Sequence, residues 1–234
     1  MYPDKACNRF AEAVSDIPDG ATIMIGGFTG PGGLPQNLIL ALRNQGARDL
    51  TIIANSTWGG GKARNYIDVS ILAENRQIKK AIVSVMADPN PLRSTAFEEQ
   101  YHAGEAEMEL VPQGTLAERI RAGGFGIGGF YTRTGVGTPV EKGKEKKSIN
   151  GKEYILELPL TADYALIRAY KADRMGNLIY RGTARNFNPV MAPAARITIA
   201  EVDEIIEPGE LDPEVIVTPG IFVKRIVKIS QEGE

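Results

Sequence analysis

The stretch that most constrains the fold of this chain is an apolar run, a glycine cluster and a helical pattern, which follow one another within residues 20–46. Residues 22–25 are the apolar run, and turn signals flank it as Asp19-Gly20 and Gly26-Gly27. An apolar run without alternation is typical of a strand buried on both faces of a parallel sheet. The sequence therefore predicts a short, fully buried strand that ends in a glycine loop.

A helix is predicted directly after this loop. Leu38, Ile39 and Leu42 recur at helical spacing, Pro35 suits the first helical position, and Gly46 supplies a stop. Glycines let the backbone approach a ligand closely, and a helix start directs free N–H groups and a positive dipole end toward it. We expect an anion or an acyl oxygen to bind there. The alternative is that the glycines serve only the turn.

The remaining pattern alternates between strands and helices and becomes strand-rich in the last third. This alternation predicts one α/β domain over residues 1–234, with an open, mostly parallel sheet; 43% hydrophobic residues suffice for its core. Met175-Gly176-Asn177 predicts a hairpin between two of the strands. Strands are expected at residues 49–55, 79–86, 108–111, 164–173, 178–181, 196–202, 215–217 and 221–227, and further helices at 5–16 and 92–101.

A second informative stretch follows the strand at 108–111. Thr115 and Glu118 have the spacing of a capping box, which predicts a helix that starts at Thr115 and stops at Gly123. Gln113 would then lie between the carboxyl end of a strand and a helix N-terminus. Because parallel strands end at one edge of a sheet, we expect Gln113 at the same edge as the glycine loop.

Two other motifs carry no chemistry in this interpretation. Residues 124–129 match the G-x-G-x-x-G spacing of dinucleotide sites, but a helix precedes them and a β-rich stretch follows, which is the wrong context. Residues 141–147 are a charged, lysine-rich run that predicts a solvated loop in a small β-rich excursion.

Composition excludes several classes of function. A net charge of -2 and a pI near 5.7 provide no electrostatic footprint for nucleic acid. Cys7 and His102 are the only residues of their types, so an intrachain disulfide and a histidine or cysteine metal cluster are excluded, and we expect His102 at the surface. No apolar run reaches membrane-spanning length. We therefore expect a cytoplasmic protein without a bound metal, a nucleic-acid partner or a membrane partner.

Several motifs in matching order resemble the A (alpha) subunits of family I coenzyme A transferases, which act on acetoacetate, other 3-oxoacids, 3-oxoadipate or acetate. One departure is that six residues separate Phe28 from Pro35, where the family pattern has five. The motifs are Asp19-Gly20 through Gly26-Gly27-Phe28 with Pro35-Gln36-Asn37-Leu38-Ile39, then Pro112-Gln113-Gly114-Thr115-Leu116-Ala117-Glu118-Arg119, Lys171-Ala172-Asp173-Arg174, Ala184-Arg185-Asn186-Phe187-Asn188, Glu207-Pro208-Gly209-Glu210-Leu211-Asp212-Pro213 and Thr218-Pro219-Gly220-Ile221.

The resemblance implies a fold, a reaction and a partner. The fold is a three-layer α/β structure of the CoA transferase and ribose-phosphate isomerase type. The reaction moves CoA from an acyl-CoA such as succinyl-CoA or acetyl-CoA to a carboxylate through a glutamyl thioester. The family's nucleophilic glutamate belongs to the B (beta) subunit, so the resemblance implies an A2B2 heterotetramer in which the alpha chain alone is inactive. It implies CoA as a substrate and no permanently bound cofactor.

The resemblance also assigns site residues. Gln113 corresponds to the glutamine that stabilises the oxyanion, while Arg185 and Asn186 are expected to be a structural or interface pair. The CoA-binding loop would comprise Gly26, Gly27, Phe28, Thr29, Gly30, Pro31 and Gly32.

Alternatives remain open on the sequence alone. Gln113 is alternatively a helix-entry residue that bonds the backbone. Glu141 has a Glu-x-Gly spacing, but we expect its charged loop to be unsuitable for a nucleophile. The chain is alternatively a non-enzymatic ligand-binding or regulatory protein, because one fold can serve many functions. The acyl donor and acceptor are not determined by the sequence.

Overall fold

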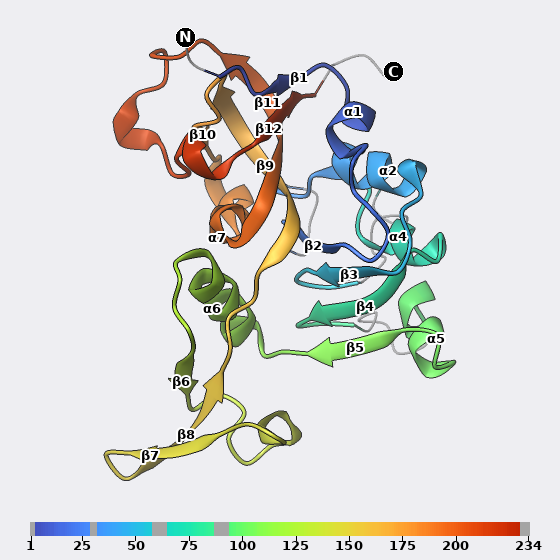
Figure 1. Ribbon diagram of the computed structural model, residues 1–234, viewed down its shortest axis with the longest axis vertical. Helices are drawn as coiled ribbons and strands as arrows, with labels where there is room; N and C mark the ends of the chain where they lie inside the picture. The colour runs from blue at the N-terminus through green and yellow to red at the C-terminus, as the bar shows by residue number, and fades with distance from the viewer. Residues whose placement is uncertain (1–2, 29–31, 58–64, 87–93, 230–234) are drawn as a thin grey trace.

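A largely parallel sheet forms the middle of the molecule (Figure 1). The computed structural model describes residues 3–28, 32–57, 65–86 and 94–229. Within them, every neighbouring pair along the sheet is parallel, and only β10 (Leu178–Ile179) runs antiparallel, against β9. In spatial order the other strands are β1 (Ala6–Cys7), β12 (Arg225–Lys228), β11 (Ala195–Ile206), β9 (Ala162–Asp173), β2 (Thr22–Ile25), β3 (Leu50–Ile53), β4 (Ile78–Val83) and β5 (Glu107–Leu110).

Successive residues of β2 show why this strand is apolar throughout. Ile23 and Ile25 pack into the core on one face of the sheet, and Met24 packs into the core on the other. Helices cover both faces, so a strand in the middle has no solvent side. The predicted buried strand and the three-layer α/β class are confirmed.

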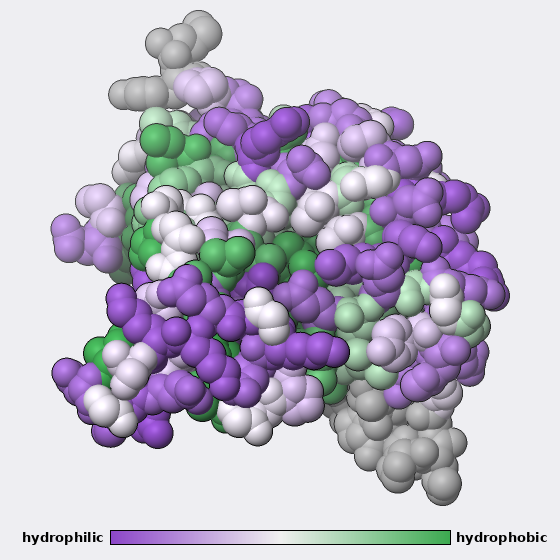
Figure 2. Space-filling model, turned by 60° about the horizontal axis from the view of Figure 1, so that its bottom comes forward, coloured by the Kyte–Doolittle hydropathy of each residue, from purple (hydrophilic) through white to green (hydrophobic). Residues whose placement is uncertain are grey.

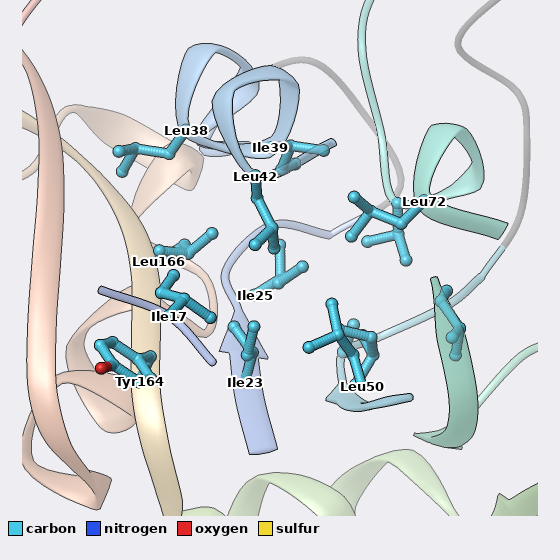
Figure 3. Packing of buried hydrophobic residues seen from close by; sticks show 14 of the residues in the cluster. Ile17, Ile23, Ile25, Leu38, Ile39, Leu42, Leu50, Leu72, Tyr164 and Leu166 are labelled. Atoms are coloured by element: carbon cyan, nitrogen blue, oxygen red, sulfur yellow. The ribbon is translucent and has the colours of Figure 1, made fainter. Parts of the chain in front are cut away.

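The helices divide between the two faces (Figure 1). In Figure 3, Leu38 and Leu42 of α2 face the strand residues Ile25 and Leu166. One face carries α1 (Phe10–Val14), α2 (Gln36–Gln45), α4 (Ser70–Glu74) and α5 (Ala96–His102), and the other carries α6 (Gln113–Gly124) and α7 (Asn188–Met191). Short 3-10 helices are η1 (Pro139–Glu141), η2 (Gly182–Arg185), η3 (Ala192–Ala194), η4 (Pro213–Val215) and η5 (Gly220–Phe222). No helix in these described ranges is long and apolar enough to cross a lipid bilayer.

The β-rich excursion is a separate antiparallel sheet of β6 (Phe130–Thr132), β8 (Lys152–Glu157) and β7 (Lys146–Ile149). It projects from one end of the molecule (Figure 1), and hydrophilic residues cover much of that end (Figure 2). Lysines on the edge strand β7 discourage pairing with another chain. The charged run at 141–147 is thus not wholly a loop, because it includes the end of η1 and the start of β7.

Two element predictions near the chain ends are wrong. Ala6 and Cys7 do not open a helix; they form the edge strand β1, because β12 offers them an open parallel ladder with Ala6 opposite Ile226. Residues 215–217 do not form a strand. Pro213 favours the helical φ of a turn, and the Asp212 side chain accepts a hydrogen bond from the Glu214 N–H, which together produce η4.

The predicted start of α6 is also wrong. Pro112 is the N-cap, and its carbonyl accepts the Leu116 N–H at 2.8 Å, so Thr115 is buried inside the first turn. A capping box is present instead at α5, where Thr95 is the N-cap and Glu98 is its partner. At the other end α6 continues past Gly123 to Gly124. Gly123 permits a close approach instead, because a Cβ there would lie only 1.9 Å from the Leu160 carbonyl oxygen.

Candidate functional site

The candidate site is the carboxyl edge of β2, β3, β4 and β5. These four strands are adjacent and parallel, so the loops that follow them meet at one edge of the sheet. The glycine loop follows β2, and Gln113 follows β5 after Val111 and Pro112. Their expected common edge is confirmed. Three strand spacings separate β2 from β5, which corresponds to about 14 Å at ~4.8 Å per spacing.

Gln113 is exposed as the first residue of α6. Within the described residues its side chain makes no hydrogen bond, so the alternative in which it bonds the backbone is not observed there. An amide side chain carries two N–H donors. At this position the amide can donate to an oxygen that lies above the sheet edge.

The first N–H groups of the glycine loop donate hydrogen bonds to other groups of the protein. The Gly26 N–H donates to the Leu166 carbonyl at 2.9 Å, and the Gly27 N–H donates to Asn186 Oδ1 at 3.1 Å. Gly27 has φ +117°, a conformation that favours glycine, and Phe28 beyond it is exposed. The predicted contact residues Thr29, Gly30 and Pro31 lie outside the described residues, whereas Gly32 lies within them.

The N-terminus of α2 is occupied by a carboxylate of the same chain. Glu201, which is 1% exposed on β11, accepts the N–H groups of Asn37 at 2.8 Å and Leu38 at 3.1 Å. Burial raises the pKa of this carboxyl, against the opposing effects of those hydrogen bonds and of Arg168 at 3.7 Å. The expectation that this dipole end faces a ligand is wrong, because Glu201 already satisfies it.

Sequence reasoning missed Glu201 and Asn188. Asn188 is fully buried; it accepts the Arg168 N–H at 2.9 Å and donates to the Gly33 carbonyl at 3.0 Å. A signal for Glu201 was available, since it interrupts the apolar positions at the middle of β11, and an acid buried there must be paired. Asn186 was expected to be structural, and its contact with Gly27 is consistent with that expectation.

A small hollow separates the glycine loop from the end of β3. It has a volume of about 20 Å³, enough for one water-sized group, and its lining includes Gly27, Phe28 and Asn55. Asn55 is 4% exposed, yet its Oδ1 has no hydrogen-bond partner within the described residues. The same holds for the buried Oγ of Ser84 on the neighbouring strand end. Buried polar atoms are nearly always satisfied, so this edge presents groups that a ligand or water would satisfy.

The carboxylates of interest elsewhere are already engaged. Glu141 accepts hydrogen bonds from Lys146 and from the Gly137 N–H, and the bond from Lys146 lowers the pKa of its carboxyl. Glu157 is buried against Lys144 at 2.5 Å. With Glu201 committed to α2, none of these three acids is placed to attack a substrate at the sheet edge.

The sequence profile of the coenzyme A transferases matches residues 7–229. The chain belongs to the coenzyme A transferase family. This coenzyme A transferase chain is 52% identical to the A subunit of the probable succinyl-CoA:3-ketoacid coenzyme A transferase of Bacillus subtilis, covering 95% of this chain and 89% of that protein. It is 51% identical to the A subunit of the 3-oxoadipate CoA-transferase of Pseudomonas putida, over 97% of this chain and 94% of that one. Identity to the alpha subunit of the acetate CoA-transferase of Escherichia coli is 47%, with 95% and 96% coverage.

Solved structures show the same fold at low identity. An acyl-CoA transferase of E. coli O157:H7, in a thioester complex with CoA, superimposes with a TM-score of 0.81 at 22% identity over 99% of this chain. The present transferase chain spans about half of that protein, 50% of its length. Glutaconate coenzyme A-transferase from Acidaminococcus fermentans gives a TM-score of 0.78 at 23% identity over 96% of this chain and 75% of its own.

Proposed function

We propose that this chain is the A (alpha) subunit of a two-chain CoA-transferase, which moves CoA from an acyl-CoA to a carboxylate. The relatives near 50% identity, all named as the A or alpha chain of such enzymes, support this proposal. The observation that carries it is the amide of Gln113 on the glycine-loop edge, unpartnered among the described residues, while Glu141, Glu157 and Glu201 are engaged elsewhere. Such a chain polarises a thioester but needs a nucleophile from outside.

The partner subunit supplies that nucleophile as a glutamate carboxylate. Its attack on the acyl-CoA carbonyl forms a mixed anhydride and releases CoA thiolate. The thiolate then attacks the glutamyl carbonyl, which frees the donor carboxylate and leaves a glutamyl-CoA thioester. The acceptor carboxylate repeats both steps in reverse and regenerates the glutamate. Covalent capture divides one difficult transfer into easier ones.

This chain contributes binding and charge stabilisation. Gln113 donates an N–H to the oxygen that becomes negative when the thioester or anhydride carbonyl is attacked, which is worth ~3 kcal/mol for a well-placed donor. The glycine loop, residues 26–32, contacts acyl-CoA. The N–H groups of Gly26 and Gly27 have protein acceptors, so these two residues shape the start of the loop. The residues from Phe28 onward make the contact with acyl-CoA.

The finer features of the proposal follow the family resemblance. Two alpha and two beta chains assemble into a heterotetramer, the enzyme works in the cytoplasm, and CoA enters only as a substrate, without a permanently bound cofactor. Succinyl-CoA or acetyl-CoA is the donor; the acceptor is a 3-oxoacid, 3-oxoadipate or a short-chain acid. The names of the relatives include succinyl-CoA, 3-ketoacid, 3-oxoadipate and acetate.

The test is reconstitution with the neighbouring-gene product as the beta partner. The purified pair is assayed with succinyl-CoA and acetyl-CoA against a panel of acetate, acetoacetate, 3-oxoadipate and succinate. We expect transfer by the pair and none by either chain alone. Transfer by this chain alone would refute the division of labour, and failure to pair, together with sugar-phosphate binding, would favour the regulatory alternative.

Gln113→Ala tests the role of the amide in the active pair. We expect kcat to fall well over tenfold, because one oxyanion donor is lost, while the assembled complex elutes unchanged in size-exclusion chromatography. Gly114→Ala is the matched control: it alters the same exposed helical turn, and its new Cβ would meet nothing within 4 Å. Unchanged kcat in Gln113→Ala would remove this residue from the mechanism.

A further inference from the structure

Two asparagine side chains connect the glycine loop to the segment that leads into α7. Asn186 contacts the beginning of the loop through Gly27, and Asn188 contacts its end through Gly33. We name this pair the asparagine clamp. Its members are separated from the loop by 159 and 155 residues in the sequence, so the contact is purely tertiary.

Asn186 adopts a backbone conformation that few residues other than glycine adopt, with φ 28° and ψ -124°. The hydrogen bonds of its side chain explain why an asparagine occupies this position. Oδ1 accepts the N–H groups of Gly27 at 3.1 Å and Phe187 at 2.6 Å, and Nδ2 donates to the Ala184 carbonyl at 3.1 Å. The strained backbone therefore aims one side-chain oxygen at the start of the glycine loop.

The fit between clamp and loop leaves no room for larger residues. A Cβ on Gly33 would lie 2.3 Å from Asn186 Nδ2, and a Cβ on Gly26 would lie 1.8 Å from Asn188 Oδ1. Between the two asparagines, the Phe187 ring stacks on Phe28 with centroids 6.3 Å apart and planes at 23°. Three consecutive residues thus contact the two ends of the loop, and the glycines at those ends allow this close approach.

We propose that Asn186 is a positioning residue for acyl-CoA: through the Gly27 N–H it fixes the backbone that places Phe28 at the substrate-binding edge. This inference rests on the proposed function of the loop. Asn186 acts through the loop, since its polar atoms are directed at protein groups. A backbone held in place before binding loses less conformational freedom when a ligand binds, so the hydrogen bond to Gly27 favours binding through preorganisation.

The test substitutes Asn186→Gly in the reconstituted two-chain enzyme. Glycine adopts the native φ without strain, so folding is retained while the bond to Gly27 is lost. We expect KM for acyl-CoA to rise about fivefold, from the loss of one anchoring hydrogen bond, with a smaller change in kcat. Asn186→Asp retains the Oδ1 acceptor for the Gly27 N–H and should restore part of the loss.

Asn150→Gly is the matched control. Asn150 also has positive φ, 51°, but it lies in the turn between β7 and β8, away from the loop. Its KM should equal that of the wild type. Thermal unfolding and size-exclusion chromatography are run on all variants, because a merely structural role for Asn186 would lower stability or assembly and leave KM unchanged.

The possible outcomes distinguish a failure of this inference from a failure of the proposed function. A raised KM in Asn186→Gly, partly rescued by aspartate and absent in Asn150→Gly, supports positioning. An active wild-type pair whose KM is unaltered by Asn186→Gly overturns the inference alone. A wild-type pair that transfers no CoA refutes the proposed function, and the inference fails with it.

Discussion

Gly26→Ala should destabilise the chain through one side chain, that of Asn188. Gly26 has no positive φ, so its backbone accepts alanine, but the new Cβ would lie 1.8 Å from Asn188 Oδ1 and 2.8 Å from Asn188 Cγ. Asn188 must move away from its partners, the Arg168 N–H and the Gly33 carbonyl. Each buried polar group left without a partner costs ~1–3 kcal/mol, so two of them together cost about 4 kcal/mol.

The same reasoning predicts strong coupling. Asn188→Ala removes every atom among the three nearest to the new Cβ, and it costs a similar amount, about 4 kcal/mol, because it leaves the same groups unpaired. Gly26→Ala added to this variant should then cost almost nothing, and it should recover about 0.5 kcal/mol from the reduced entropy of the unfolded chain. The coupling free energy is therefore about 4 kcal/mol.

Urea unfolding followed by circular dichroism measures these free energies for the wild type, both single variants and the double variant. The four values form a double-mutant cycle, and the slope against urea should be equal in all four. If Gly26→Ala costs as much in the Asn188→Ala background as in the wild type, the two effects are additive. Additivity would show that Asn188 is not what excludes a side chain at Gly26.

Two further predictions concern pH and a helix end. Hydrogen bonds from Arg225 lower the pKa of Asp16 in the folded protein below its ordinary value. The pair therefore stabilises the fold fully at a pH above the pKa that Asp16 has in the unfolded chain. This stabilisation is lost as the pH falls through the pKa that Asp16 has in the folded protein. Arg225→Gln should therefore cost more unfolding free energy at pH 6 than at pH 3, and equal costs would contradict the pairing. Gly46→Ala should lower the free energy of unfolding by about 1 kcal/mol, as measured by urea unfolding. Gly46 caps α2 with φ 88°, and a Cβ there would meet nothing within 4 Å, so the cost arises only from the backbone conformation. An unchanged urea midpoint would contradict this explanation.

Local pattern predicted most of the central fold. Residues 22–25 are apolar because both faces of β2 are buried, and the helical repeat of Leu38, Ile39 and Leu42 reflects one buried face of α2. Some predictions failed because a local contact competed with the pattern, as Pro213 does at η4, and others failed because a distant partner decided the outcome. Ala6 and Cys7 become a strand only because β12 lies beside them, more than two hundred residues later.

Some features of the candidate site were also predictable from local pattern, and others were not. The position of Gln113 on the glycine-loop edge follows from the parallel order of the strands, which the alternation of elements predicts. Its assignment as an oxyanion donor came from the family resemblance and stays a prediction. The occupant of the α2 N-terminus was not predictable in this way, since Glu201 is 164 residues from Asn37.

By itself the sequence determined the α/β class, the buried central strands and the family, because each is written in short patterns of apolar residues, glycines and motifs. Only the tertiary structure decided what surrounds the glycine loop. Asn186 and Asn188 contact it from the segment before and within α7, and Glu201 of β11 binds the start of the helix that follows it. Hydrogen bonds between residues so far apart in the chain produce no periodic pattern in the sequence. Asn188 and Asn186 explain two of its glycines, because a Cβ on Gly26 would meet Asn188 and a Cβ on Gly33 would meet Asn186.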